Sequence, residues 1–224
     1  MAIALGKPDF GRICGPYVPD LIVRNETSCW RVYESDQVDF DATSWNTGRR
    51  EIDDPGAGRF DPLPSEDTDF IYGAVSAELA IVEKCEPLAM WSPDLGGPVV
   101  RVSSLSGLSL ARFSLSATVA VAQIYTSEGL APFGVSESVC TESDHMRTRE
   151  FGPFFREKAP SASGLSYKTG ITQADLGGFS FLLWRDRCNG LRLLPVGGEI
   201  RLDSEAGVVL VGAILRKRRI TLLP

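Results

Sequence analysis

The sequence has 224 residues, of which 43% are hydrophobic and 23% are charged, and it carries a net charge of −6. These values are ordinary for a soluble globular protein, and the length suits one domain with a sizeable core or two small ones. The acidic balance argues against a nucleic-acid surface, so direct nucleic-acid binding is not expected. No apolar run reaches the length of a membrane span and the first residues do not resemble a signal peptide, which favours a cytoplasmic protein without membrane contact.

The cysteines and the histidine give no sign of a metal or disulfide framework. The five cysteines are scattered and odd in number, which favours a reducing compartment. The sole histidine, His145, has no second histidine and no nearby pair of thiols, so no metal site is predicted. A catalytic dyad of His145 with Cys140 is the alternative to the favoured interpretation, an exposed loop histidine.

In the N-terminal part, residues 1–28 are interpreted as an extension, in which positions 21–23 fit either a short strand or a helix end. Residues 28–33 are dense in aromatic and β-branched side chains and predict a strand. The polar region 34–56 predicts a long loop of the kind that is usually functional or mobile. Residues 70–75 predict a short buried strand.

A short helix is predicted directly after that strand. Ser76 has the residue type of an N-cap, and Glu78 lies in the first turn, where the helix dipole favours a carboxylate. Glu83 follows Leu79 and Ala80 at a spacing of four and three residues, so it shares the face that packs on the sheet. A carboxylate on a buried face is costly unless it is paired or functional. The structural alternative is a helix-edge glutamate that reaches water or pairs with Arg59.

The C-terminal half is less regular. Residues 99–102 and 191–194 predict strands, and 105–124 fit either two strands or a strand and a helix. Residues 129–164 allow no assignment. A helix is predicted to begin near Thr172 and to continue through Trp184, although two glycines weaken it. The apolar stretch 207–215 predicts a strand, and the basic run 216–219 that follows it predicts a solvated end.

Four residues in the first part of the chain match one known pattern. Gly58-Arg59-Phe60 forms a Gly-Arg-aromatic turn, Tyr72 lies in the next strand, and Glu83 follows eleven residues later on the helix. Upstream, Cys29 to Tyr33 contains an aromatic residue followed by Arg31. From about Cys29 to Glu86 the chain resembles the RES-domain family, which is named for an Arg, a Glu and a Ser.

The resemblance implies a fold, a substrate and a partner. The implied fold is a single α+β domain, similar to the mono-ADP-ribosyltransferases, with a small split mixed β-sheet core and short helices over residues 29–224. The implied activity is cleavage of NAD, as substrate and without a metal, in a cleft lined by Arg31, Arg59, Tyr72 and Glu83. Family members act as toxins of toxin–antitoxin pairs and either degrade NAD or transfer ADP-ribose, so a cognate antitoxin is the expected partner. A homodimer remains open.

The residue types in this set suit NAD chemistry. Arginine presents a planar fork of donors to a pyrophosphate, which assigns Arg31 and Arg59 to cofactor binding. The flat ring of Tyr72 offers a stacking surface for nicotinamide. The carboxylate of Glu83 can hydrogen-bond ribose hydroxyls and stabilise an oxocarbenium-like centre, as glycosidases do. Neither a G-x-G-x-x-G nor a P-loop motif occurs, which argues against Rossmann and P-loop enzymes.

The third signature residue of the family departs from the pattern. RES domains commonly carry a serine after a proline at the end of a late strand, but here Val196 follows Pro195. The next serine, Ser204, lies in a predicted turn. The alternative function is therefore a catalytically degenerate RES-like module that binds a partner protein or a nucleotide. A third interpretation is that the resemblance is accidental and Glu83 is structural.

Overall fold

The computed structural model describes residues 21–37, 39–47, 58, 60–136, 138–141, 149, 151–168 and 177–224. Within these ranges, nine strands form the main sheet in the order β1-β7-β8-β9-β3-β2-β6-β10, and β11 also pairs with β6. Their bounds are β1 (Leu21–Val23), β7 (Val119–Gln123), β8 (Gly164–Tyr167), β9 (Ser180–Trp184), β3 (Phe70–Ala74), β2 (Cys29–Glu34), β6 (Leu108–Leu115), β10 (Leu193–Pro195) and β11 (Ile200–Arg201).

The sheet is mixed and nearly divided in the middle. Only β7 and β8 run parallel within it, while the other described pairs are antiparallel. The joint between β2 and β3 consists of the single pair Trp30 and Ala74, whereas β2 and β6 pair over six positions. The two halves of the sheet therefore diverge from this joint, as the expected split sheet requires. Leu21–Val23, predicted as part of an extension, forms an edge strand of this sheet.

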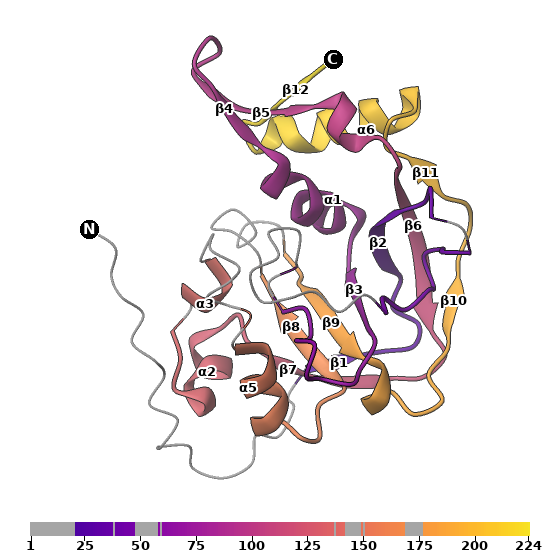
Figure 1. The fold of residues 1–224 in the computed structure, drawn as a ribbon, viewed down its shortest axis with the longest axis vertical. Coiled ribbons are helices and arrows are strands. Elements are labelled where there is room, and N and C mark those ends of the chain that lie inside the picture. The colour runs from indigo at the N-terminus through magenta and orange to yellow at the C-terminus, as the bar shows by residue number, and fades with distance from the viewer. Residues whose placement is uncertain are drawn as a thin grey trace.

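Short helices cover one face of the sheet in two groups (Figure 1). The helices are α1 (Ala77–Cys85), α2 (Ser127–Leu130), α3 (Ser138–Thr141), α5 (Phe151–Lys158) and α6 (Glu205–Lys217), with 3₁₀ turns η1 (Glu86–Leu88), η2 (Val102–Leu105), η3 (Ala131–Phe133) and η5 (Arg185–Arg187). A smaller sheet of β12 (Thr221–Leu223), β5 (Gly97–Arg101) and β4 (Met90–Ser92) lies beside α6.

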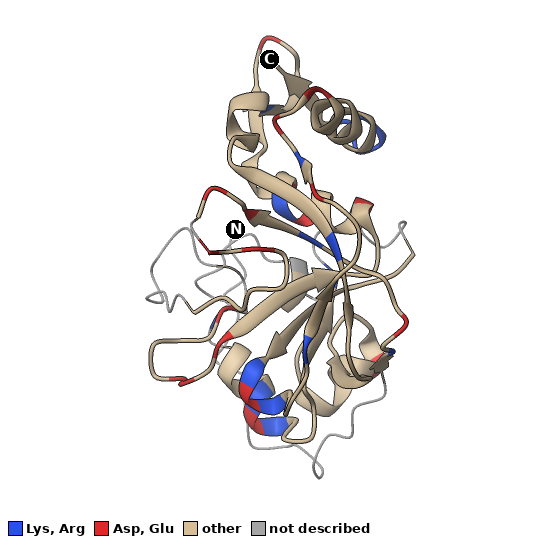
Figure 2. Cartoon of the chain, turned by 90° about the vertical axis from the view of Figure 1, so that its right-hand side faces the viewer, with Lys and Arg blue, Asp and Glu red and all other residues tan. Residues whose placement is uncertain are grey.

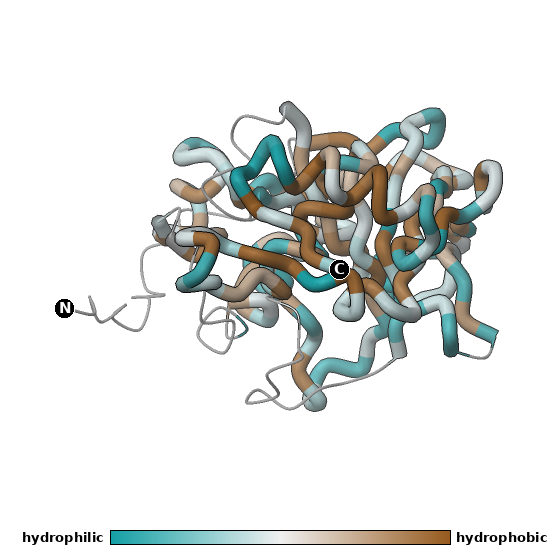
Figure 3. Tube along the Cα trace, turned by 90° about the horizontal axis from the view of Figure 1, so that it is seen from above, coloured by the Kyte–Doolittle hydropathy of each residue, from teal (hydrophilic) through white to brown (hydrophobic). Residues whose placement is uncertain are grey.

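Alternation along the strands divides the core into clusters on the two faces. On one face, α1 and α6 pack with Ala74 and Leu110 in a first cluster, and α2 and α5 pack with Leu165 and Leu182 in a second. Ile71, Phe113, Phe181 and Leu183 form a third cluster on the other face. Hydrophobic stretches run through the interior (Figure 3), and charged residues gather mainly at loops and helix ends (Figure 2).

Helix α1 begins and ends where the sequence predicts. The Ser76 hydroxyl accepts a hydrogen bond from the Leu79 amide at 3.2 Å, which satisfies one of the unpaired donors of the first turn. Pro87 follows in η1 and terminates the regular helix. The predicted strands at 28–33, 70–75, 99–102 and 191–194 are confirmed as β2, β3, β5 and β10, and residues 105–124 form two strands, β6 and β7.

Two predicted elements are wrong. Residues 180–184, expected to continue a helix, form β9, whose five residues are all buried between β8 and β3. Residues 181–184 are all apolar, so their period does not distinguish a strand from a helix, and tertiary contacts decide between the two. Residues 207–215, expected as a strand, lie in α6, where Val211, Ile214 and Leu215 share the buried face and Val209 is 67% exposed.

Candidate functional site

Tyr72 and Glu83 meet at a third residue, Tyr167. The phenol of Tyr167 donates a hydrogen bond to the Glu83 carboxylate. The rings of Tyr72 and Tyr167 lie edge to face, with centroids 6.2 Å apart and planes at 86°. Tyr72 and Tyr167 belong to the cluster beneath α2 and α5, whereas Glu83 lies on α1. The three side chains therefore lie where the two helical groups adjoin.

The strand register explains why the two tyrosines share a face. Tyr167 is paired with Ser180, and Ser180 is paired with Ala74 on β3. Residues paired across neighbouring strands point to the same face, and Tyr72 lies two positions from Ala74. Glu83 is half-buried on the side of α1 that faces Tyr167. The predicted placement of a carboxylate on the packed side of this helix is therefore correct, and its neighbour is a phenol.

The hydroxyl of Tyr72 has protein partners. It accepts from the Phe60 amide at 3.2 Å, and the Asp61 carboxylate lies nearby. Burial, followed by the Asp61 charge, raises the pKa of Tyr72 well above its usual value of 10, although the hydrogen bond from the Phe60 amide acts in the opposite direction. Tyr72 is therefore a neutral phenol at physiological pH, and its hydroxyl is already used by the Phe60 amide.

Asp61 is a site residue that sequence reasoning missed. It is only 5% exposed, and its Oδ2 accepts from the Gly58 amide at 2.7 Å. A Cβ at position 58 would lie 2.5 Å from Asp61 Oδ1 and 2.8 Å from the Tyr72 hydroxyl, so only glycine fits this close approach. An aspartate in a polar connection carries no signal of its own. Its position directly after the Gly-Arg-aromatic turn is the only sequence feature that points to it.

Arg59 lies outside the described residues. Its two neighbours are described, and both are anchored to the site: Gly58 donates to Asp61, and Phe60 donates to Tyr72. The prediction that Arg59 acts in this cleft stays a prediction.

Arg31 is not brought to Tyr72 and Glu83. Because Trp30 pairs with Ala74, alternation places Arg31 on the opposite face of β2 from Tyr72. Its guanidinium donates to the Ser44 carbonyl at 2.7 Å and the Asn46 side chain at 2.6 Å, and burial lowers the pKa of Arg31 to about 10. These contacts hold the loop at 42–46 beside β3, and the predicted cofactor-binding function of Arg31 stays a prediction.

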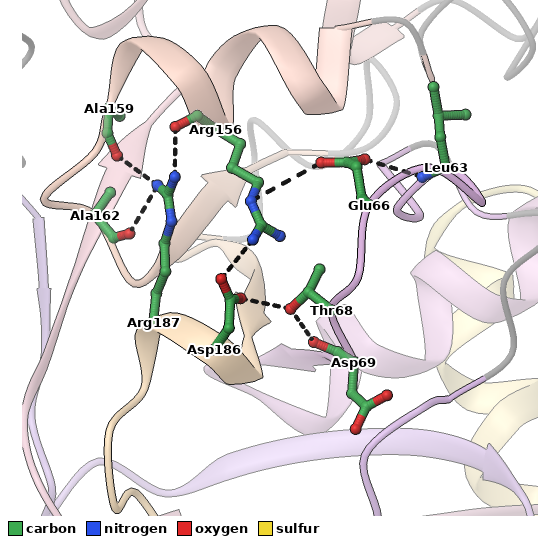
Figure 4. Close-up of polar contacts among 9 residues, drawn as sticks. All are labelled: Leu63, Glu66, Thr68, Asp69, Arg156, Ala159, Ala162, Asp186 and Arg187. Carbon is green, nitrogen blue, oxygen red and sulfur yellow. Dashed lines mark hydrogen bonds and ion pairs between the residues drawn. The ribbon is translucent and has the colours of Figure 1, made fainter.

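A second polar cluster fixes the chain that enters β3 (Figure 4). Arg156 of α5 pairs with Asp186 and with Glu66, which also accepts from the Leu63 amide at 2.9 Å. Thr68 donates to Asp186, and Arg187 donates to carbonyls at the end of α5. Asp69 pairs with Arg185 at 2.8 Å. The acidic residues before β3 are therefore largely neutralised by arginines.

The candidates for the third signature residue occupy different environments. Val196 directly follows β10. The Ser204 hydroxyl caps α6, accepting from the Gly207 amide at 3.2 Å and donating to the Arg201 carbonyl at 2.6 Å. Ser180, which the sequence pattern does not single out, lies on the same face as Tyr167 and is completely buried, and its hydroxyl has no hydrogen-bond partner within the described chain.

The other candidates from the sequence are not at this site. His145 lies outside the described residues, and the Cys140 thiol is buried and donates to the Ile124 carbonyl. Across the described ranges, no group of three potential metal ligands is found. The helices of those ranges are all too short or too polar to span a membrane.

Comparisons with known proteins agree with this architecture. The family model described as the RES domain matches residues 28–203. Among solved structures, a chain in the crystal structure of the M. tuberculosis MbcT–MbcA toxin–antitoxin complex is similar, with a TM-score of 0.52 and 16% sequence identity. The match covers 80% of this chain and 85% of that chain, and it shows a shared α+β fold. A search of curated proteins finds no match.

Proposed function

We propose that this chain, which belongs to the RES family, cleaves NAD at the bond between nicotinamide and ribose. The observation that carries the proposal is the contact of the Glu83 carboxylate with Tyr167, beside the ring of Tyr72. A half-buried carboxylate next to two aromatic rings suits a flat cationic ring attached to a sugar, because the rings provide packing and the carboxylate provides the opposite charge.

In the proposed reaction, nicotinamide packs against the ring of Tyr72. The glycosidic bond breaks, and its electron pair moves to the ring nitrogen and neutralises the pyridinium. Glu83 stabilises the positive charge that develops on the ribose, and its hydrogen bond from Tyr167 fixes the direction of the carboxylate. Arg59 supplies donors to the pyrophosphate. Arg31 adds donors where the loop at 42–46, which it holds, contacts the ligand. The acceptor is water, phosphate or a protein side chain, which adds to the ribose carbon and releases a proton.

The same proposal includes a cytoplasmic location and a cognate antitoxin. The similar solved structure is a toxin–antitoxin complex, and a protein that consumes NAD needs such an inhibitor. The acidic segment at residues 66–69 is a candidate contact for a basic segment of the antitoxin, which would compete with the existing pairs of Glu66 with Arg156 and of Asp69 with Arg185. A partner that covers the Tyr72 side of the sheet would block the site directly.

A second candidate function is a non-catalytic module that binds a nucleotide or a protein. The specific observation in its favour is that Val196 follows Pro195, where the family pattern leads us to expect a serine, and that the Ser204 hydroxyl caps α6. The two functions differ in turnover, because a module would bind NAD without releasing nicotinamide.

Purified protein mixed with NAD distinguishes the two. Nicotinamide release that is lost in Glu83→Gln, together with unchanged melting temperature, supports the enzyme. Binding of NAD by calorimetry without release supports the module. In cells, expression without an antitoxin is expected to lower NAD and stop growth, whereas arrest at constant NAD would indicate modification of a protein instead.

A further inference from the structure

We propose that two copies of this protein pair along the exposed side of α6, with the two helices antiparallel across a two-fold axis. The surface lies outside the candidate site, and the proposal does not depend on the proposed activity. Helix α6 lies at the end of the molecule that carries the small sheet (Figure 1), and it begins after residue 203, where the match to the family model ends.

Helix α6 is apolar on all sides but is covered on only one. Residues 206–215 carry neither a charge nor a polar side chain. One side of the helix packs with α1 and β12 in the first core cluster, whereas Ala206, Val209 and Ala213 on the other side are exposed, Val209 by 67%. A helix that is hydrophobic all round is normally buried all round. The composition of α6 therefore predicts a second contact that a single chain does not provide.

The exposed apolar residues form a continuous seam along α6. Positions 206, 209 and 213 are separated by three and four residues, so they follow one side of the helix. Two helices that pack side by side meet along a seam with this spacing. The alanines allow the two helix axes to approach closely, and Val209 fills the space between them. The thirteen residues of α6 span only about 20 Å, so the contact is small and the association is expected to be weak.

The charges at the two ends of the seam favour a second copy as the partner. Glu205 lies in the first turn and Arg216 in the last, and both are exposed. Neither has an ion-pair partner within the described chain. In an antiparallel pair, Glu205 of each copy faces Arg216 of the other, and the helix dipoles oppose one another. A parallel pair would bring like charges together. The seam is therefore complementary to itself in the antiparallel direction, as a two-fold contact requires.

Sedimentation velocity of the full chain measures the association. Between about 1 and 300 µM the wild type is expected to pass from monomer to dimer, with a dissociation constant of roughly 10–100 µM. Val209→Asp places a carboxylate in the middle of the seam and is expected to weaken association at least tenfold. Its melting temperature at low concentration should stay unchanged, because residue 209 is exposed in the single chain.

Leu95→Asp is the matched control for Val209→Asp. Leu95 is 55% exposed and lies on the connection between β4 and β5 rather than on α6. Its replacement is expected to leave the dissociation constant within about twofold of the wild type. A wild type that stays monomeric over this range of concentration, or a dimer that Val209→Asp weakens no more than Leu95→Asp does, would overturn the proposal.

A charge swap tests the antiparallel arrangement. Glu205→Arg alone and Arg216→Glu alone each place like charges opposite one another, and each is expected to weaken association about three- to tenfold. The double variant restores an opposite pair and is expected to return to within about twofold of the wild type. Losses that add in the double variant would show that the two residues do not meet, and the antiparallel pairing of α6 would be wrong.

Discussion

The phenol of Tyr167 donates a hydrogen bond to the carboxylate of Glu83 across 84 positions of sequence. This bond joins the end of β8 to the last turn of α1 and directs the carboxylate toward β8. The structural interpretation of Glu83 drawn from sequence was a helix-edge glutamate that reaches water or pairs with Arg59, and Arg59 lies outside the described residues. The contact with Tyr167 gives the carboxylate a hydroxyl partner from β8.

Replacement of Glu83 by Gln separates chemistry from structure. The side chain keeps its volume and can still accept from Tyr167, but it loses the charge opposite a developing cation. Glu83→Gln is expected to melt like the wild type and to lose about 3–4 kcal/mol of transition-state stabilisation, or roughly a hundred- to a thousandfold in turnover. Melting temperature and nicotinamide release are measured on one preparation. A variant that melts early yet keeps its turnover per folded molecule would contradict a catalytic function.

Removal of the Tyr167 hydroxyl tests whether the direction of Glu83 matters. Tyr167→Phe keeps the ring packing with Phe60 and Tyr72 but deletes the hydrogen bond. Stability is expected to fall by about 1.5–3 kcal/mol, as for other hydrogen bonds to charged groups, and turnover by about tenfold with little change in KM. Tyr33→Phe is the control, since Tyr33 donates a comparable bond to Glu199 away from Tyr72. If both variants lose turnover equally, the loss in Tyr167→Phe does not come from the orientation of Glu83, and the prediction is wrong.

Two buried serines are expected to respond in opposite directions. Ser180 has no hydrogen-bond partner in the described chain, so Ser180→Ala should raise the free energy of unfolding by up to about 1 kcal/mol. Ser166 is equally buried, but its hydroxyl donates to the Ala122 carbonyl, so Ser166→Ala should lower it by about 0.5–1.5 kcal/mol. Urea denaturation measures both, and destabilisation by Ser180→Ala would reveal a partner for that hydroxyl.

Arg31 offers a test of binding against structure. Arg31→Lys keeps the charge but cannot reproduce the fork that bonds Ser44 and Asn46, so about 2–3 kcal/mol of stability is expected to be lost. Arg112→Lys, on the adjacent strand, removes a half-buried guanidinium stacked on Trp30 and should cost less. An unchanged melting temperature with a raised KM for NAD would instead support direct cofactor binding by Arg31.

Stability is expected to decline in alkali because of three buried thiols. Burial raises the pKa of Cys29, Cys85 and Cys188 from 9.0 to about 12. Between these values the unfolded chain releases thiol protons that the folded protein keeps, so the free energy of unfolding falls as pH rises, by up to about 1.4 kcal/mol per pH unit for each thiol. Urea unfolding between pH 8 and pH 11 measures this slope. Cys85→Ala should make the slope shallower, and an unchanged slope would assign the decline to other groups.

Local chemistry was sufficient to predict α1 and the strands beside it. A serine cap, an acidic first turn and a following proline act within one or two helical turns, and each leaves its mark in adjacent residues. The position of Glu83 on the packed side of α1 followed from the same spacing. The family pattern of Gly58, Tyr72 and Glu83 could be read for the same reason, since it lies within 26 successive residues.

Only the tertiary structure decided the partners of those residues and the type of the all-apolar segments. Tyr167 reaches Glu83 because β8 and β9 place it on the face of Tyr72, and Asp61 is buried because a turn folds onto that face. Residues 181–184 and 207–215 are apolar throughout, so their period carries no information. The first is a strand because it lies between two strands, and the second is a helix because one side of it packs on α1 and β12 while Val209 faces water.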